Sequence, residues 1–277
     1  MKRVIGAIFL ICTSVLGIAQ TLETETANKP TERQRTYVLI MSGINKDPRE
    51  QLAKDKAVMN LRKFFLDDVK VESKRLTVLV ESSSSARKGS KNSTAENLRN
   101  TMTGLAEAIK PTDRFIFYYV GQANIVVETV RLNLPGKDIT HNHLADWMNK
   151  IKASSILIVL DCPGAGLAAK AMSGKGRIVL CGSKSDQRYS TRFSEYFIPA
   201  LVDDKSDTDG DGKVSLLEAF TLVARQLDDF YLEQRLLKTE TPLLEDNGDG
   251  VPSEQPWQYA QHKKDGLAAS KFFLSSK

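Results

Sequence analysis

The chain has 277 residues, of which 41% are hydrophobic and 26% are charged, a composition typical of a globular protein with one or two domains. Lys and Arg number 39 against 34 Asp and Glu, which leaves a net charge of +5. Because basic and acidic residues alternate after Thr31, the charge pattern predicts no nucleic-acid partner. Three cysteines are too few for a disulfide scaffold.

The N-terminus differs in composition from the rest of the chain. Lys2 and Arg3 precede an apolar run that continues to Ala19, which is typical of a secretory signal peptide over residues 1–19. An uncleaved membrane anchor is the alternative, but the run is shorter than the ~20 residues that a spanning helix needs. Residues 20–35 are polar and aperiodic, as in a linker. The sequence therefore predicts an exported protein, periplasmic or extracellular, with no membrane span after signal cleavage.

Apolar strand patterns alternate with helix patterns after the linker. Strands are predicted at 36–44, 75–82, 114–122, from 155 and at 177–183, and helices at 48–69, 93–109, 141–151 and from 191. Strands that are apolar on both faces indicate a mainly parallel sheet between helices. The predicted fold class is therefore α/β, a three-layer sandwich over residues 36–202, with residues 203–277 forming a helix–calcium loop–helix and a tail packed on the same domain. The functional side chains of such sheets gather at the carboxyl ends of the strands.

Two of the predicted strand ends resemble those of the caspase-fold cysteine peptidases, in particular the legumain-like and metacaspase-like branches and their bacterial relatives. In that family one strand ends in Ser-Gly-His-Gly, which supplies the general base, and the next core strand ends in Asp-x-Cys-x-Ser-Gly, which supplies the nucleophile. The segments here are YVGQA (119–123) and DCPGAG (161–166). The segment KTETPLLEDNGDG (238–250) is also similar to the tail of bacterial legumain-like proteins. The resemblance implies a caspase-like sheet, and it puts Gln122 in the histidine position and Pro163 in the cysteine position.

These two replacements affect the chemistry. A cysteine peptidase needs a thiolate and a base that accepts its proton, whereas Gln122 cannot accept that proton and Pro163 has no nucleophile. The resemblance thus implies a homologue with a degenerate dyad, in which Cys162 is a small buried residue at a strand end. The alternative is an active endopeptidase in which Cys162 pairs with a displaced histidine, His143. Cys162 and Cys181 end neighbouring parallel strands, which rarely suit a disulfide, so two free thiols are expected.

A binding cleft is expected at the carboxyl edge of the sheet. Its predicted lining is Ser42, Gly43, Gln122, Asn124, Asp161, Cys162 and Ser183. The glycine turns at Gly121 and at 164–166 would present backbone N–H groups to a carbonyl or carboxylate, which suits a peptide ligand.

The segment DTDGDGKVSLLE (207–218) matches the consensus of a calcium loop at every fixed position. The predicted ligands are the side chains of Asp207, Asp209 and Asp211, the carbonyl of Lys213, a water held by Ser215 and both carboxylate oxygens of Glu218. The alternative is an acidic, glycine-rich turn between helices that binds no metal. The segment EDNGDG (245–250) is also acidic but lacks a closing glutamate, so only one calcium site, with a structural role, is predicted.

Together these features predict an exported calcium-binding protein of caspase-like fold that binds a peptide or protein partner and is not a catalyst. The alternatives are the cysteine endopeptidase described above and a hydrolase of another class that uses Asp161 and Gln122 as polar anchors.

Overall fold

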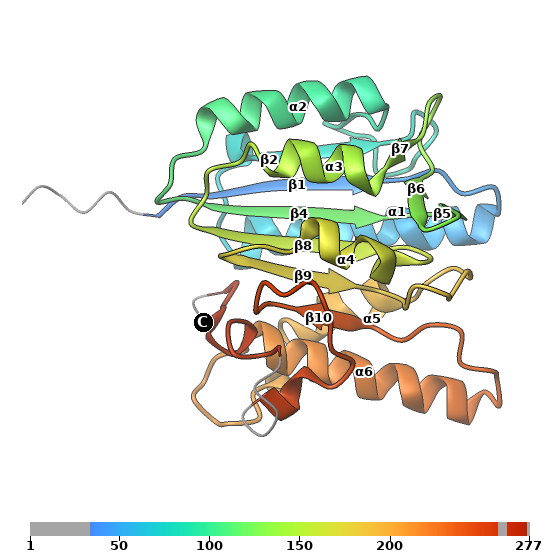
Figure 1. Ribbon diagram of the computed structural model, residues 1–277, viewed down its shortest axis with the longest axis vertical. Helices are drawn as coiled ribbons and strands as arrows, with labels where there is room; N and C mark the ends of the chain where they lie inside the picture. Colours follow the sequence, from blue (N-terminus) through green and yellow to red (C-terminus); the bar gives the residue numbers. More distant parts are fainter. Residues whose placement is uncertain (1–33, 260–264, 276–277) are drawn as a thin grey trace, which may run out of the picture. The chain divides into compact units, whose positions relative to one another are not determined.

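The computed structural model describes residues 34–259 and 265–275, so the predicted signal peptide and most of the predicted linker lie outside the described residues. The main sheet has the strand order β10-β9-β8-β4-β1-β2-β3 (Figure 1). Its strands are β1 (Thr36–Ser42), β2 (Leu76–Val80), β3 (Lys91–Asn92), β4 (Arg114–Val120), β8 (Ser155–Asp161), β9 (Arg177–Cys181) and β10 (Leu243–Glu245). All neighbouring strands are parallel except β10, which is antiparallel to β9. The predicted α/β class with a mostly parallel sheet is confirmed.

Helices pack against both faces of this sheet. They are α1 (Pro48–Lys63), α2 (Ala95–Ala108), α3 (His141–Met148), α4 (Ala169–Met172), α5 (Phe193–Ala200) and α6 (Leu216–Glu233). Successive side chains of a strand point to opposite faces, so each strand contributes to two cores. In β4, Phe117 packs in the core that contains α2, α3 and α4, whereas Tyr118 packs in the core that contains α1, α5 and α6.

The strand order reverses between β1 and β4. The chain leaves β1 for β2 on one side and later returns to form β4 on the other side of β1 (Figure 1). A ligand crevice is typical of such a switch point, outside the carboxyl ends of the two strands. The segments that follow β1 and β4 are in contact where they leave the sheet. A Cβ on Gly43 would lie 2.1 Å from the Tyr119 hydroxyl, and one on Gly121 only 2.8 Å from the Cα of Gly43. Glycine at both positions therefore permits the close approach that shapes this edge.

Some elements differ from the sequence-based expectation. A separate antiparallel sheet of β5 (Ala123–Val126), β6 (Thr129–Leu132) and β7 (Ile139–Thr140) follows β4, although no strand was predicted there. The predicted helix 48–69 is α1 followed by a π-helical turn, Phe64–Asp68. The predicted strand 114–122 ends at Val120, because its last two residues turn away from the sheet.

The C-terminal part of the chain shares its core with the sheet. Phe220 of α6 and Phe272 of the tail pack in the same cluster as Leu180 of β9. The acidic loop 207–215 is entered from a short 3₁₀ helix, Asp204–Ser206, and not directly from α5. Only the helix that follows the loop is long.

Candidate functional site

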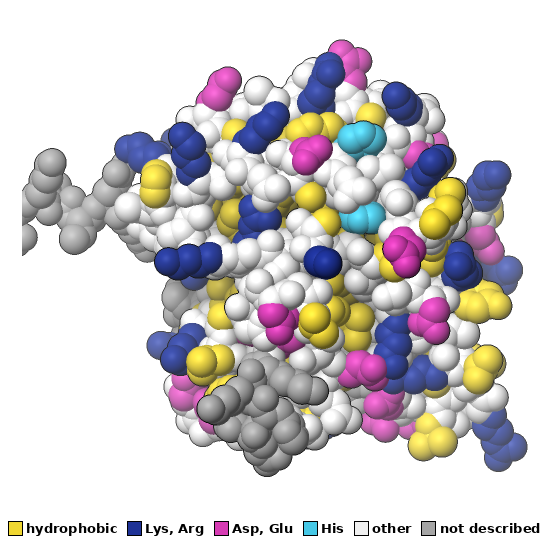
Figure 2. Space-filling view, in the orientation of Figure 1, with side chains coloured by type: hydrophobic (Ala, Val, Ile, Leu, Met, Phe, Trp, Pro, Cys, Tyr) yellow, Lys and Arg dark blue, Asp and Glu magenta, His cyan; other side chains and the backbone are white. Residues whose placement is uncertain are grey.

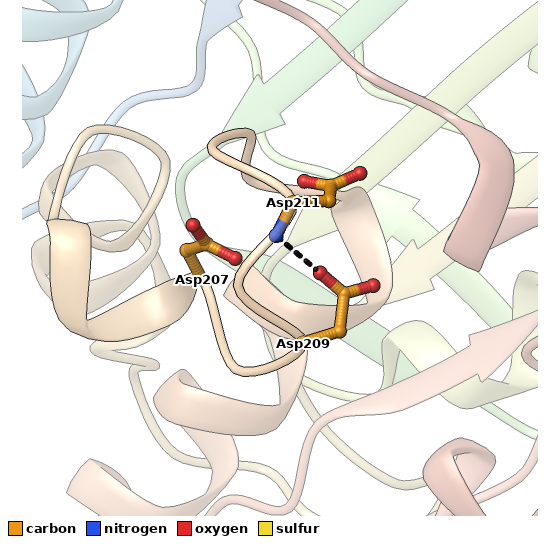
Figure 3. Close-up of side chains that lie close together, drawn as sticks. All are labelled: Asp207, Asp209 and Asp211. Atoms are coloured by element: carbon orange, nitrogen blue, oxygen red, sulfur yellow. Dashed lines mark hydrogen bonds between the residues drawn. The ribbon is translucent and has the colours of Figure 1, made fainter.

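The acidic loop before α6 brings three carboxylates together (Figure 3). One oxygen from each of Asp207, Asp209 and Asp211 lies within 4.8 Å of the others. The Asp207 carboxylate accepts hydrogen bonds from the N–H groups of Gly210 (2.8 Å) and Gly212 (2.9 Å), and these two glycines have positive φ. The backbone therefore wraps around the first carboxylate, and three negative charges that repel one another are held in one turn.

Glu218 closes this loop from the first turn of α6. Its Oε1 accepts a hydrogen bond from the Thr208 N–H (2.8 Å), and its Oε2 accepts from both the N–H and the hydroxyl of Ser215 (2.9 Å each). Partial burial acts to raise the pKa of Glu218, but the hydrogen bonds from Ser215 and Thr208 outweigh it and lower the pKa. Because Ser215 is the N-cap of α6, the carboxylate is positioned by the helix itself.

The structure thus places all six predicted ligand residues in one loop, with Lys213 N–H donating to Asp211 (2.8 Å). Every predicted ligand atom is an oxygen, and a set of six such residues is the kind of coordination that Ca²⁺ takes in proteins. The residues fit such an ion.

A second polar cluster lies at the switch point between β1 and β4. The side-chain amide of Gln122 donates to the Glu50 carboxylate (3.0 Å) and to the Ser190 hydroxyl, and Asn45 also donates to Glu50. Partial burial acts to raise the pKa of Glu50, but the hydrogen bonds from Ser190, Asn45 and Gln122 outweigh it and lower the pKa. Gln122, the residue in the predicted histidine position, is therefore a hydrogen-bond donor to an ionised carboxylate. Sequence reasoning missed Glu50 and Ser190, which only the fold brings to this edge.

A cavity of about 450 Å³ opens beside this cluster. It is lined by Glu50, Ala53, Lys54, Tyr189, Ser190, Thr191, Arg192, Glu195, Phe230, Tyr231, Leu236, Leu237 and Thr239. The Lys54 ammonium is buried and donates to the Thr191 carbonyl (2.7 Å), whereas Tyr189 and Leu237 are exposed at the rim. The cavity thus combines charges of both signs with an exposed apolar rim.

Cys162 is buried and has no accessible thiol. Its side chain is 0% exposed and packs in a hydrophobic core, and its carbonyl accepts a hydrogen bond from the Ser183 hydroxyl (2.9 Å). Burial, with the nearby charge of Asp161, raises the pKa of the Cys162 thiol well above its ordinary value. Burial likewise raises the pKa of Cys181 to about 12, and both thiols are free, as expected.

The displaced base of the alternative hypothesis lies elsewhere. The ring of His143 contacts the Thr140 hydroxyl (3.1 Å) in the capping box of α3, and it lines a different cavity of about 620 Å³ together with Arg99, Lys137 and Trp147. Within the described residues, no hydrogen bond joins His143 to Cys162. The structure therefore does not bring these two candidates together.

Most of the predicted cleft residues are fully buried. Ser42, Asp161 and Ser183 are 0% exposed, and Asp161 accepts hydrogen bonds from the N–H (3.0 Å) and hydroxyl of Ser194 at the start of α5. Asn124 is exposed on the β5–β6 hairpin, where it donates to Asn133 (3.0 Å). Polar residues at the strand ends thus stabilise the fold's own turns in place of lining an open cleft.

The glycine turns also differ from the expectation. The N–H of Gly121 donates to the carbonyl of Asp161 (3.1 Å), and that of Gly164 donates to the carbonyl of Gln187 (2.8 Å). These donors are used within the chain, because tight turns at a sheet edge satisfy their own backbone groups.

Comparison of the sequence with protein-family models and with curated proteins finds no match in either case. Within residues 34–259 and 265–275, no helix is both long and apolar enough to cross a membrane. Figure 2 shows Lys and Arg side chains interspersed with Asp and Glu side chains over one face of the molecule. Fold and site together define a class: an α/β protein with a mostly parallel sheet and an acidic loop before its longest described helix.

Proposed function

We propose that this protein is an exported calcium-binding protein of caspase-like fold that binds a peptide or protein partner and does not act as a thiol catalyst. The observation that supports the proposal most directly is the loop 207–218, where three aspartates and a closing glutamate are held around one turn by backbone hydrogen bonds. The caspase-like assignment depends on the resemblance of residues 119–123 and 161–166, with which the switch between β1 and β4 is compatible.

The positions of three residues in the fold support the proposed absence of thiol catalysis. Cys162 is buried with a raised thiol pKa, His143 is engaged at the start of α3, and Gln122 donates to Glu50. A buried thiol of high pKa holds little thiolate at neutral pH, so it is a poor nucleophile.

The partner site that we propose is the cavity beside Glu50 and Ser190. A carboxylate, an ammonium group and an apolar rim around Tyr189 and Leu237 suit an extended peptide that carries both charged and apolar side chains. The proposed role of calcium is structural, because the loop lies between the sheet-packed α6 and a 3₁₀ turn, and Ser215 pairs with Phe273 of the tail.

Calcium binding is tested by calorimetry and thermal melting of the chain from Gln20 onward. At ~1 mM Ca²⁺ and a Kd of ~0.1 mM, mass action adds about 1.4 kcal/mol to the free energy of unfolding. We expect the calcium-induced rise in Tm to be reduced in Glu218→Gln and retained in full in Glu233→Gln, a matched change at an exposed position of α6. No heat and no shift in Tm at millimolar calcium would overturn the calcium assignment.

Catalysis is tested separately with a thiol-directed probe and a diverse peptide library. We expect no cleavage, and labelling of Cys162 that is slower than that of free cysteine. Cleavage that disappears in Cys162→Ala would instead establish the endopeptidase.

A further inference from the structure

The segment after β10 has the backbone of the first acidic loop. With Glu245 as position 1, the N–H groups of positions 4 and 6, Gly248 and Gly250, both donate to its Oε1 (2.7 and 3.4 Å). In the loop 207–218 the same two positions donate to the first carboxylate at 2.8 and 2.9 Å. Gly248 and Gly250 have φ of 88° and 78°, compared with 74° and 80° at the corresponding glycines of the first loop.

The middle positions also correspond. The N–H of Asp249 donates to the side-chain oxygen of Asn247 (2.8 Å), and the N–H of Val251 donates to the Asp249 carboxylate (2.7 Å). The first loop has the same bonds from position 5 to position 3 and from position 7 to position 5, at 3.1 and 2.8 Å. The side chains at positions 1, 3 and 5 therefore accept hydrogen bonds from the same backbone positions in both loops.

Asp265 occupies the place of the missing closing glutamate. Its Oδ1 accepts from the N–H groups of positions 2 and 3, Asp246 (3.0 Å) and Asn247 (3.3 Å), and its Oδ2 accepts from the hydroxyl of position 9, Ser253 (2.8 Å). Glu218 accepts from positions 2, 3 and 9 of its own loop at 2.8, 3.3 and 2.9 Å. A carboxylate from the tail thus replaces the one that the consensus places at position 12.

An independent observation concerns Glu245 and Asp265, for which no cationic partner is found within residues 34–259 and 265–275. Glu245 is 0% exposed. With Oε1 on the loop amides, its second oxygen, Oε2, is buried beside the Ser173 hydroxyl, with no hydrogen bond of good geometry. Asp265 is also 0% exposed. Among the described residues, no Lys or Arg forms a salt bridge with either carboxylate. Two buried, unpaired carboxylates are costly unless a cation joins them.

We propose that the segment 245–253 together with Asp265 forms a second calcium site. Its ligands are the carboxylates of Glu245 and Asp249, the amide oxygen of Asn247, the carbonyl of Val251 and the closing carboxylate of Asp265. The ion connects the end of β10 to the C-terminal tail. This site is independent of the calcium loop in the proposed function, because the two share no residue.

Calcium is titrated by calorimetry into the chain from Gln20 onward, with single and double variants. We expect two ions per chain in the unmodified protein, one in Glu245→Gln, one in Glu218→Gln and none in the double variant. Glu254→Gln is the matched control, since Glu254 is an exposed residue directly after the segment 245–253 and pairs with Lys184, and this variant should keep both ions. Asp249→Ala, a change at an exposed position, repeats the test should Glu245→Gln not fold.

Thermal melting with and without calcium gives a second readout, and its result would differ if Glu245 only stabilised the fold. In EDTA, Glu245→Gln removes a buried charge, so its Tm should equal or exceed that of the unmodified protein. In millimolar calcium its Tm should be lower. One ion per chain that persists in Glu245→Gln and Asp249→Ala would overturn the second site alone, whereas one ion that persists in Glu218→Gln and disappears in Glu245→Gln would support it and overturn the first. No ion in any protein would overturn both.

Discussion

Replacement of Glu240 by glutamine should stabilise the protein at pH 8 and have little effect on its stability at pH 5. Glu240 follows α6 and is fully buried. Its carboxyl group accepts hydrogen bonds from the Arg192 N–H (2.7 Å) and the Tyr231 hydroxyl (3.0 Å). Burial, with the charge of Asp161, nevertheless raises its pKa from 4.5 to about 7, while the positive charge of Lys54 acts in the opposite direction.

The sign follows from proton linkage. Between pH 4.5 and about 7 the folded protein keeps the Glu240 proton that the unfolded chain has lost, so the folded state binds more protons and its stability falls as pH rises. The contribution is complete below pH 4.5 and is lost as pH rises through about 7. At about 1.4 kcal/mol per pKa unit, the loss amounts to about 3 kcal/mol. Glutamine does not ionise, so Glu240→Gln should match the unmodified protein at pH 5 and exceed it by up to about 3 kcal/mol at pH 8.

The assay is urea unfolding at pH 5, 6, 7 and 8 with calcium held constant. Glu233→Gln, a change at an exposed position of α6, serves as the control and should follow the unmodified protein at each pH. A difference between Glu240→Gln and the unmodified protein that does not change with pH would refute the reasoning, because the carboxyl group would then have the same pKa in both states.

Two further substitutions test the packing around the carboxyl edge of the sheet. Gly43→Ala would put a methyl group 2.1 Å from the Tyr119 hydroxyl and 2.8 Å from the Asn133 carbonyl, so we expect a loss of about 2 kcal/mol or more, seen as a lower urea midpoint. Tyr118→Phe removes the hydrogen bond to the Ser194 hydroxyl (2.8 Å) and should cost about 1 kcal/mol. Because Ser194→Ala also removes the hydroxyl's bond to Asp161, the shared bond is isolated with a double-mutant cycle of Tyr118→Phe and Ser194→Ala, and costs that simply add would contradict the second prediction.

The order and type of the main elements are predictable from the sequence because strands buried on both faces leave continuous apolar runs. The β5–β6 hairpin is not, because its two-residue turn has Val127 at φ 55°, where Asn or Gly is the usual signal. Valine is β-branched and 90% exposed at this turn, so neither local preference nor burial explains it.

The candidate sites also differ in how far the sequence predicts them. The loop 207–218 is predictable because its ligands lie in one short segment at a fixed spacing. The sequence does not predict the closing role of Asp265 or the cluster of Glu50, Gln122 and Ser190. Each of these sites joins residues that are distant in sequence and meet only in the fold. Burial of Asp161 was missed for a related reason: a carboxylate at a strand end faces solvent or caps a neighbouring helix, and only the placement of α5 decides which.

The positions of the two acidic loops separate any calcium effect from the proposed partner site. The antiparallel β10 runs away from the carboxyl end of β9, so the loop after Glu245 lies toward the amino ends of the parallel strands (Figure 1). The loop 207–218 lies on the same side, because Ser215 pairs with Phe273, whose carbonyl accepts a hydrogen bond from Arg114 at the start of β4 (2.8 Å). The cavity beside Glu50 lies at the opposite, carboxyl edge. Loss of calcium should therefore lower the stability of the C-terminal tail without changing direct contacts to a peptide at that cavity. A peptide affinity that fell in EDTA at a temperature where the protein stays folded would show that the sheet transmits the effect.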